Sequence, residues 1–354
     1  MRLNSRARMC GITLIELMVS MVIGLFMMGA VLYVVEESRV TYRHNDNFGR
    51  IQEAGRIGIE LMAHDARMAG YFGCLPPRNQ VVVKAVPPPA SGVDFRKVAA
   101  IQGDVYPGSS AGLVDYGALL GVPGSDVVTL RKASNNPINL TGNLATNNAN
   151  IQVSSNPDNF QAGDLLLITD CSAGDLFRAT TVSKGAGPII TIAHAAATNT
   201  TPQLSKVYGP DATIMRFAQE MYYLRDSGRT AADGSPIISL FRRNVANLAE
   251  APVELVEGVT NMRAIYGLDV DNDAARTIDT YVLAAAVTSA QWAQIRSVRL
   301  EVLVAGEDNV ARDAQPYYFN GVVNTPPING GTGLPDRRLR QSFNVTAAFR
   351  NLLN

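Results

Sequence analysis

One carboxylate, Glu16, interrupts an otherwise apolar run that covers residues 12–35. A charged side chain is costly in hydrocarbon, so an acid in such a run is by default functional and needs a partner. The run follows directly on Gly11, and three arginines precede that glycine: Arg2, Arg6 and Arg8. Glu16 is therefore the first candidate functional residue, and ion pairing is the chemistry that it offers.

A second group of carboxylates lies in residues 269–279, at Asp269, Asp271, Asp273 and Asp279. Aspartates at alternate positions open many calcium-binding loops, because a hard cation prefers oxygen ligands. The segment departs from that loop at its sixth position, Ala274, which is not glycine, and at its twelfth, Thr280, which is not glutamate. The alternative is a solvated acidic turn between two strands. We assign no metal and keep the four aspartates as a calcium candidate.

A G-S-S-A-G stretch at residues 108–112 matches the nucleophile-elbow pattern around Ser110. That pattern needs a strand-turn-helix setting together with a histidine and an acid. The chain has three histidines. His44 and His64 fall in a predicted helix, and His194 falls in a strand-like run. We predict no catalytic residue, and a serine hydrolase remains a remote alternative.

Composition excludes other functions. Basic and acidic residues balance at 31 each, and no basic face suggests a nucleic-acid partner. Cofactor fingerprints, phosphate-binding glycine loops and zinc patterns are absent from the sequence, so no cofactor is expected.

Of the three cysteines, Cys10 would be lost on cleavage after Gly11. In an exported domain Cys74 and Cys171 would then form a disulfide, the alternative being two buried thiols.

The elements that position these residues begin with the apolar run. Its 24 residues would form about 36 Å of helix, enough to cross a bilayer. The preceding arginines should stay cytoplasmic, which places the rest of the chain outside the inner membrane. Because no A-x-A cleavage pattern follows the run, we expect it to be retained.

The helix is predicted to run from about residue 13 to about residue 69, well beyond the apolar run. Apolar and small residues recur at steps of three to five positions, and the segment contains no proline. They are Phe48, Ile51, Gly55, Gly58, Leu61 and Ala66. Gly70 is the expected C-terminal stop. The sequence therefore predicts a helix whose first half lies in lipid and whose second half packs on a sheet.

After Gly70 the sequence predicts mainly antiparallel β structure, because short runs with period-two alternation are separated by turn clusters. One later helix is expected over residues 288–297. The fold class is thus α+β. The domains are residues 1–11, a leader; 12–70, the long helix; and 71–354, a β-rich domain.

The N-terminal residues G-I-T-L-I-E-L resemble a class III, prepilin-type signal. The resemblance implies cleavage between Gly11 and Ile12 by a prepilin peptidase and methylation of the Ile12 amino group. Glu16 becomes the fifth residue, where it can pair with the α-amino group of a neighbouring subunit. Ile12 departs from the usual phenylalanine or methionine. The signal is shared by all type IV pilins and type II secretion pseudopilins.

Later blocks resemble the PilW-type minor pilins of type IV pili, including A-G-Y-F-G-C at residues 69–74 and the segment around Cys171. Others are residues 222–244, 254–282 and 338–351. The resemblance implies a non-enzymatic subunit that helps to initiate pilus assembly and enters the fibre near the tip. Its implied partners are other minor pilins, the major pilin and a tip adhesin. Its implied location is the inner membrane, with a periplasmic C-terminal domain, and then the surface pilus. The alternative is a minor pseudopilin.

Overall fold

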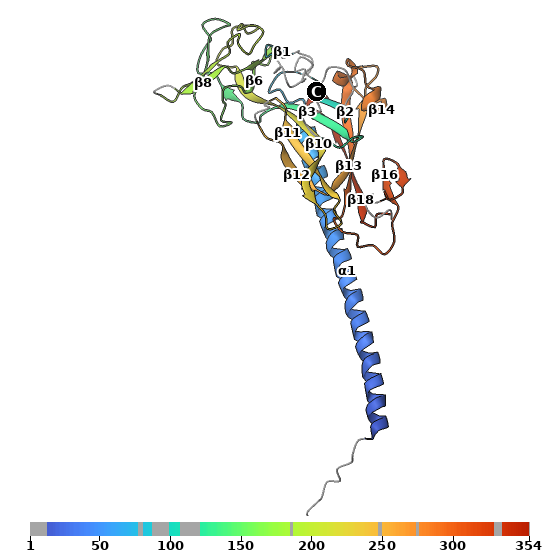
Figure 1. The fold of residues 1–354 in the computed structure, drawn as a ribbon. Coiled ribbons are helices and arrows are strands. Elements are labelled where there is room, and N and C mark those ends of the chain that lie inside the picture. The colour runs from blue at the N-terminus through green and yellow to red at the C-terminus, as the bar shows by residue number, and fades with distance from the viewer. Residues whose placement is uncertain are drawn as a thin grey trace, which may run out of the picture.

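The computed structural model describes residues 13–76, 81–86, 99–106, 121–184, 187–246, 250–273, 276–328 and 335–353. One helix, α1 (Leu14–Met68), projects far out of a β-rich domain (Figure 1). The layout is the α+β arrangement expected from the sequence, with a long apolar N-terminal helix and a mostly antiparallel β domain.

Both ends of α1 are capped, and the stop at Gly70 is the one that the sequence predicts. Thr13 is the N-cap and forms a capping box with Glu16, and Ala69 is the C-cap. Gly70 follows with a φ of +77°, a conformation that favours glycine at the end of a helix. The predicted helix over residues 13–69 is confirmed to within a residue at each end.

The two halves of α1 have different surroundings. Side chains from Leu14 to Val35 are exposed, whereas one face of the second half is buried. The buried residues of the helix are Asn47, Ile51, Gly55, Gly58, Ile59, Met62, Ala63, Asp65 and Ala66. They pack mainly on β18, β15 and β12, so the domain covers only the half of the helix that follows the apolar run.

A four-stranded antiparallel sheet lies against this half in the order β14 (Thr280–Leu283), β13 (Val259–Leu268), β15 (Ile295–Ala305), β18 (Arg340–Ala348). Alternate residues of β13, among them Met262, Ala264 and Tyr266, enter one core with Ile51, Ile59 and Met62 of α1. Side chains at alternate positions of β13 therefore lie on the face of the sheet that meets the buried face of α1.

A nine-stranded sheet continues from the helix into an upper lobe (Figure 1). Its main path is β1 (Val81–Val83), β7 (Gly174–Arg178), β6 (Leu165–Thr169), β10 (Thr213–Thr230), β11 (Pro236–Asn244) and β12 (Val253–Glu257). β3 (Asp126–Ala133) and β4 (Ile138–Asn139) also pair with β10, and β2 (Ile101–Val105) pairs with β3. β10 begins on β6 and continues between β3 and β11, so one long strand joins the lobe to the helix.

Both faces of β6 and β7 are buried. Leu165 and Leu167 enter one core cluster, and Leu166 and Ile168 enter another on the opposite face. This explains the continuous apolar run of β6, since a strand covered on both sides need not alternate. The lobe also carries a three-stranded sheet of β5 (Ile151–Val153), β9 (Ile190–Ala193) and β8 (Thr181–Lys184). A hairpin of β16 (Tyr317–Phe319) and β17 (Val322–Asn324) flanks β18.

The prediction of a helix over residues 288–297 is wrong. Gln291–Gln294 forms a short 3-10 turn, and β15 begins at Ile295. Ser297 is held on both sides, by Gly267 of β13 and Ala348 of β18. The helix propensity of the alanine and glutamine residues is lost to this pairing, because local propensity is a weak preference that tertiary contacts override.

Candidate functional site

Glu16 lies in the first turn of α1 and caps that helix. Its Oε2 accepts hydrogen bonds of 2.9 Å from both the backbone N and the Oγ1 of Thr13. The backbone N of Glu16 donates in return to Thr13 Oγ1 at 3.3 Å. Since the first N–H groups of a helix have no partner inside it, this exchange stabilises the free end of the apolar half.

The role of Thr13 was missed, although the T-x-x-E spacing before an apolar run is itself the signature of a capping box. Gly11 and Ile12, the expected cleavage pair, lie outside the described residues, as do the leader arginines and Cys10. The structure therefore places Glu16 at the start of the helix and leaves the cleavage site as a prediction.

The exposed half of α1 is long and apolar enough to cross a membrane, and nothing in the described chain covers that segment. After Glu16, the next charged residues along the helix are Glu36 and Glu37. Glu37 also touches the β domain, since its Oε1 pairs with Arg312 Nη2 at 2.6 Å. The domain thus begins where the apolar run ends, so it would lie close to a membrane that the first half of α1 crosses.

A buried carboxylate, Asp65, fixes the second half of α1 to the sheet. Its Oδ1 accepts from Lys132 Nζ at 2.7 Å, and its Oδ2 accepts from Tyr222 Oη at 2.5 Å. Burial raises the pKa of Asp65, but the bonds from Lys132 and Tyr222 outweigh it, so the pKa lies below its ordinary value. Arg242 adds a longer contact of 3.5 Å. Asp65 therefore links the second half of α1 to both β3 and β10.

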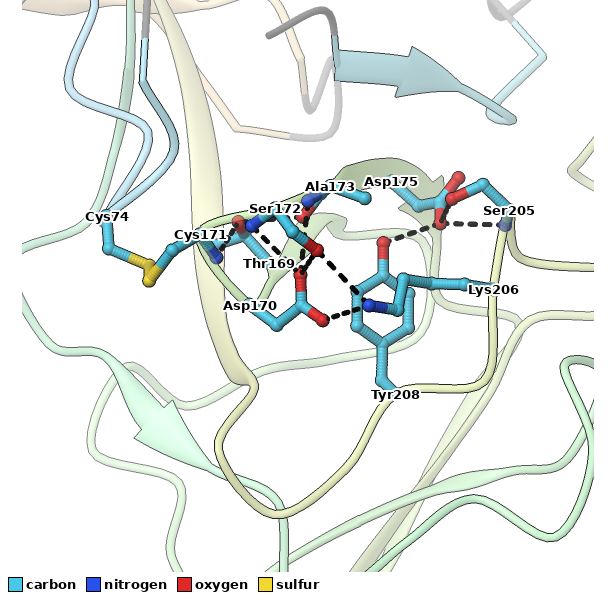
Figure 2. A network of polar contacts seen from close by, with 10 residues as sticks. All are labelled: Cys74, Thr169, Asp170, Cys171, Ser172, Ala173, Asp175, Ser205, Lys206 and Tyr208. Carbon is cyan, nitrogen blue, oxygen red and sulfur yellow. Dashed lines mark hydrogen bonds and ion pairs between the residues drawn. A yellow bond between two sulfur atoms is a disulfide. The ribbon is translucent and has the colours of Figure 1, made fainter.

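Cys74 and Cys171 form a disulfide, which confirms that prediction (Figure 2). Their Cα atoms are 4.8 Å apart, within the range that disulfides require. Cys74 comes shortly after the end of α1, and Cys171 lies in the turn between β6 and β7. The bond therefore ties the end of the helix to the upper lobe.

The turn that carries Cys171 is organised by Asp170 (Figure 2). Asp170 Oδ1 accepts from the backbone N of Ser172 at 3.2 Å, from Ser172 Oγ at 2.7 Å and from the backbone N of Ala173 at 3.1 Å. Its Oδ2 pairs with Lys206. Burial raises the pKa of Asp170, yet Lys206 and the turn donors bring it down to about 2. Cys171 itself has a φ of +67°, so this network holds a conformation that cysteine seldom adopts.

A second carboxylate, Asp175, fastens the loop beyond β9 to the same hairpin (Figure 2). Its Oδ2 accepts from the backbone N and Oγ of Ser205, at 2.8 and 2.7 Å, and from Tyr208 Oη at 2.8 Å. The sequence did not single out these residues, because Asp175 and Ser205 are 30 positions apart. Both networks support the hairpin that the disulfide secures.

The hydrolase alternative gains no support from the described residues. Ser110 lies outside them. His44 and His64 are exposed on α1, and His194 is buried in the upper lobe, where its Nε2 donates to the Ala149 carbonyl at 3.0 Å.

The aspartates of residues 269–279 divide into two roles. Asp269, Asp271 and Asp273 bring one carboxylate oxygen each to within 4.8 Å of the others. Asp279 instead accepts from the backbone N of Val270 at 2.7 Å and so closes the turn. The structure thus gathers three of the four candidate residues.

Two protein families match the chain. Residues 221–351 match the family described as type IV pilus-assembly protein W, PilW, and residues 6–32 match the prokaryotic N-terminal methylation motif. No curated protein and no solved structure matches it. The two matches support a type IV pilus-associated pilin of the PilW type, anchored in the inner membrane by its N-terminal helix. They point to a structural subunit that interacts with other pilus components rather than to an enzyme.

Proposed function

We propose that this PilW-type chain is a minor pilin that helps to initiate type IV pilus assembly and enters the fibre near the tip. The observation that carries the proposal is the division of α1 into two halves. The exposed apolar half contains a single acid, Glu16, in its first turn, and the other half is locked to the β domain. Such a subunit can insert its free half among similar helices while the domain stays outside the membrane.

Processing is the first step of the proposed route. A prepilin peptidase cuts between Gly11 and Ile12 and the Ile12 amino group is methylated, which places a positive charge next to the capping box of Thr13 and Glu16. The chain is then held in the inner membrane by one span, with the β domain in the periplasm.

Recruitment is the second step. In the single chain the Glu16 carboxylate accepts hydrogen bonds from Thr13 of its own helix. A neighbouring subunit brings an α-amino group, which is a stronger partner because it carries a full charge. A neighbour in the wrong register leaves the carboxylate without this partner in a medium of low dielectric. The free-energy cost of the unpaired charge therefore selects the right register.

The β domain would supply lateral contacts to other minor pilins, the major pilin and a tip adhesin. A minor pseudopilin of type II secretion would use the same anchor. The match of residues 221–351 to the pilus-assembly family favours the pilus. Crosslinking in cells, followed by identification of the linked subunits, separates the two machines.

The decisive experiment compares Glu16→Gln with wild type. Glutamine retains the capping box, since it serves at this position of the motif as glutamate does, but it removes the charge. We expect cleavage and membrane retention to be normal and the ratio of sheared-pilus to membrane protein to fall. The same ratio should fall at least as far for Glu16→Leu.

Two further variants isolate the charge. Thr13→Ala removes the capping partner and leaves the acid, so it should be recruited nearly as wild type. Glu60→Gln removes an exposed acid from the domain-bound half of the same helix and should have no effect. If the wild-type protein and both Glu16 variants, Glu16→Gln and Glu16→Leu, enter pili equally, Glu16 does not recruit this subunit.

A further inference from the structure

The turn after β13 holds three carboxylates in one place. Asp269, Asp271 and Asp273 stand at alternate positions, and an oxygen from each lies within 4.8 Å of the others. Asp271 and Asp273 are exposed, whereas Asp269 is fully buried at 0 % exposure. Exposed acidic groups often gather without any ligand, so the cluster alone does not define a site.

The buried member supplies an independent observation. Asp269 uses Oδ2 for Arg296, with Nε at 3.0 Å and Nη2 at 2.9 Å. Its other oxygen, Oδ1, is also buried and receives no hydrogen bond in the described part of the chain. A buried carboxylate oxygen without a donor is costly, and in native proteins such an atom calls for a water or an ion.

The local charge favours a cation over a water molecule. Arg296 also donates to Asn272 Oδ1 at 3.0 Å, so this guanidinium is already shared. Asp279 Oδ2 accepts from the backbone N of Val270 at 2.7 Å, which places a fourth carboxylate in the same turn. Negative charge is therefore in excess around the cluster.

We propose that Asp269, Asp271 and Asp273 bind a divalent cation, and that the cation is Ca²⁺. All three donors are carboxylate oxygens, which hard cations prefer, and the exposed side lets water complete the six to eight ligands that Ca²⁺ takes. Mg²⁺ needs a tighter octahedral shell and gives up its own water reluctantly. With three carboxylates and a threonine, Thr280, where calcium loops place glutamate, the affinity should fall in the range of about 10⁻⁴–10⁻³ M.

The bound ion would stabilise one edge of the domain. The turn leads into β14, the edge strand of the four-stranded sheet. Just before β14, Arg276 Nη1 donates to the Leu352 carbonyl of α2 (Arg350–Leu353) at 2.6 Å. Fixing the turn therefore fixes the edge strand and the C-terminal helix together. This inference does not rest on the proposed function, because its test uses no pilus.

The test measures unfolding of the full-length chain in detergent after treatment with a chelator. Addition of about 10 mM CaCl₂, roughly ten times the weak end of the expected range, should raise Tm by about 3–5 °C. Calorimetric titration with CaCl₂ should give one site per chain. Equal concentrations of MgCl₂ should give a smaller shift in Tm.

Asp271→Asn combined with Asp273→Asn removes two exposed ligands without disturbing the buried Asp269–Arg296 pair, and it should abolish the Ca²⁺-dependent shift. Asp313→Asn, which changes an exposed acid elsewhere on the domain, should retain the Ca²⁺-dependent shift in Tm. An equal shift in the double variant and wild type, or no shift at 10 mM CaCl₂, overturns the site. An equal response to Mg²⁺ overturns the assignment to Ca²⁺.

Discussion

Gly55 of α1 lies directly against Phe343 of β18, and a Cβ on Gly55 would come within 2.1 Å of the aromatic ring. Gly55 is buried, and Phe343 packs against the core that α1 shares with the four-stranded sheet. The absence of a side chain at this position lets the helix approach the sheet closely. That approach fixes the depth at which the domain sits on the helix.

Gly55→Ala should therefore destabilise the domain by about 1–3 kcal/mol, because an added methyl group in a packed contact forces neighbouring side chains to move. The matched control is Gly49→Ala on the same helix, where a Cβ meets nothing within 4 Å. There alanine should stabilise by up to about 1 kcal/mol through helix propensity. Urea unfolding of both variants should give changes of opposite sign; a gain in both would contradict the contact.

Loss of the Cys74–Cys171 disulfide should lower stability substantially. The bond closes a loop with a sequence separation of 97, for which the chain-entropy estimate is at most about 4–5 kcal/mol. Cys74→Ala with Cys171→Ala should shift the urea midpoint down. Reducing agent should shift wild type in the same direction and leave the double variant unchanged. A wild-type midpoint insensitive to reductant would rule out a stabilising role.

The stability of the protein should depend on pH through Asp170. Its pKa is about 2 in the folded state against an ordinary 3.8, so folding favours the charged form. The resulting stability is fully present above about pH 4 and is lost as the pH falls toward 2. Asp170→Asn should lower the free energy of unfolding at neutral pH, and the difference from wild type should shrink between pH 4 and 2. Curves that stay parallel over that interval would exclude the contacts of Asp170 with Lys206, Ser172 and Ala173 as the cause.

Gly11→Val should leave the leader attached, because glycine lets a peptidase approach the backbone closely. Mass spectrometry of the N-terminus should then find Ile12 as the first residue of the wild-type protein and an uncut chain in the variant. A wild-type terminus at any other residue would show that the cleavage site is misplaced.

Local signals made the helix and the disulfide predictable. The absence of proline over residues 14–68, the apolar spacing and Gly70 give both bounds of α1. The expected loss of Cys10 leaves two cysteines to pair. Local signals failed over residues 288–297, where sheet partners distant in the chain convert alanine and glutamine positions into a turn and the start of β15.

The sequence by itself determined the chemistry of the N-terminal segment, because a membrane span and a capped acid depend only on residues that are close together along one helix. The tertiary structure alone decided which groups surround Asp65, Asp170 and Asp269. Their partners Lys132, Lys206 and Arg296 lie 67, 36 and 27 positions away. Only the folded sheet brings such groups within hydrogen-bond distance. Burial of these carboxylates, which leaves Asp269 Oδ1 without a donor among the described residues, is likewise a property of the packed domain and of no local pattern.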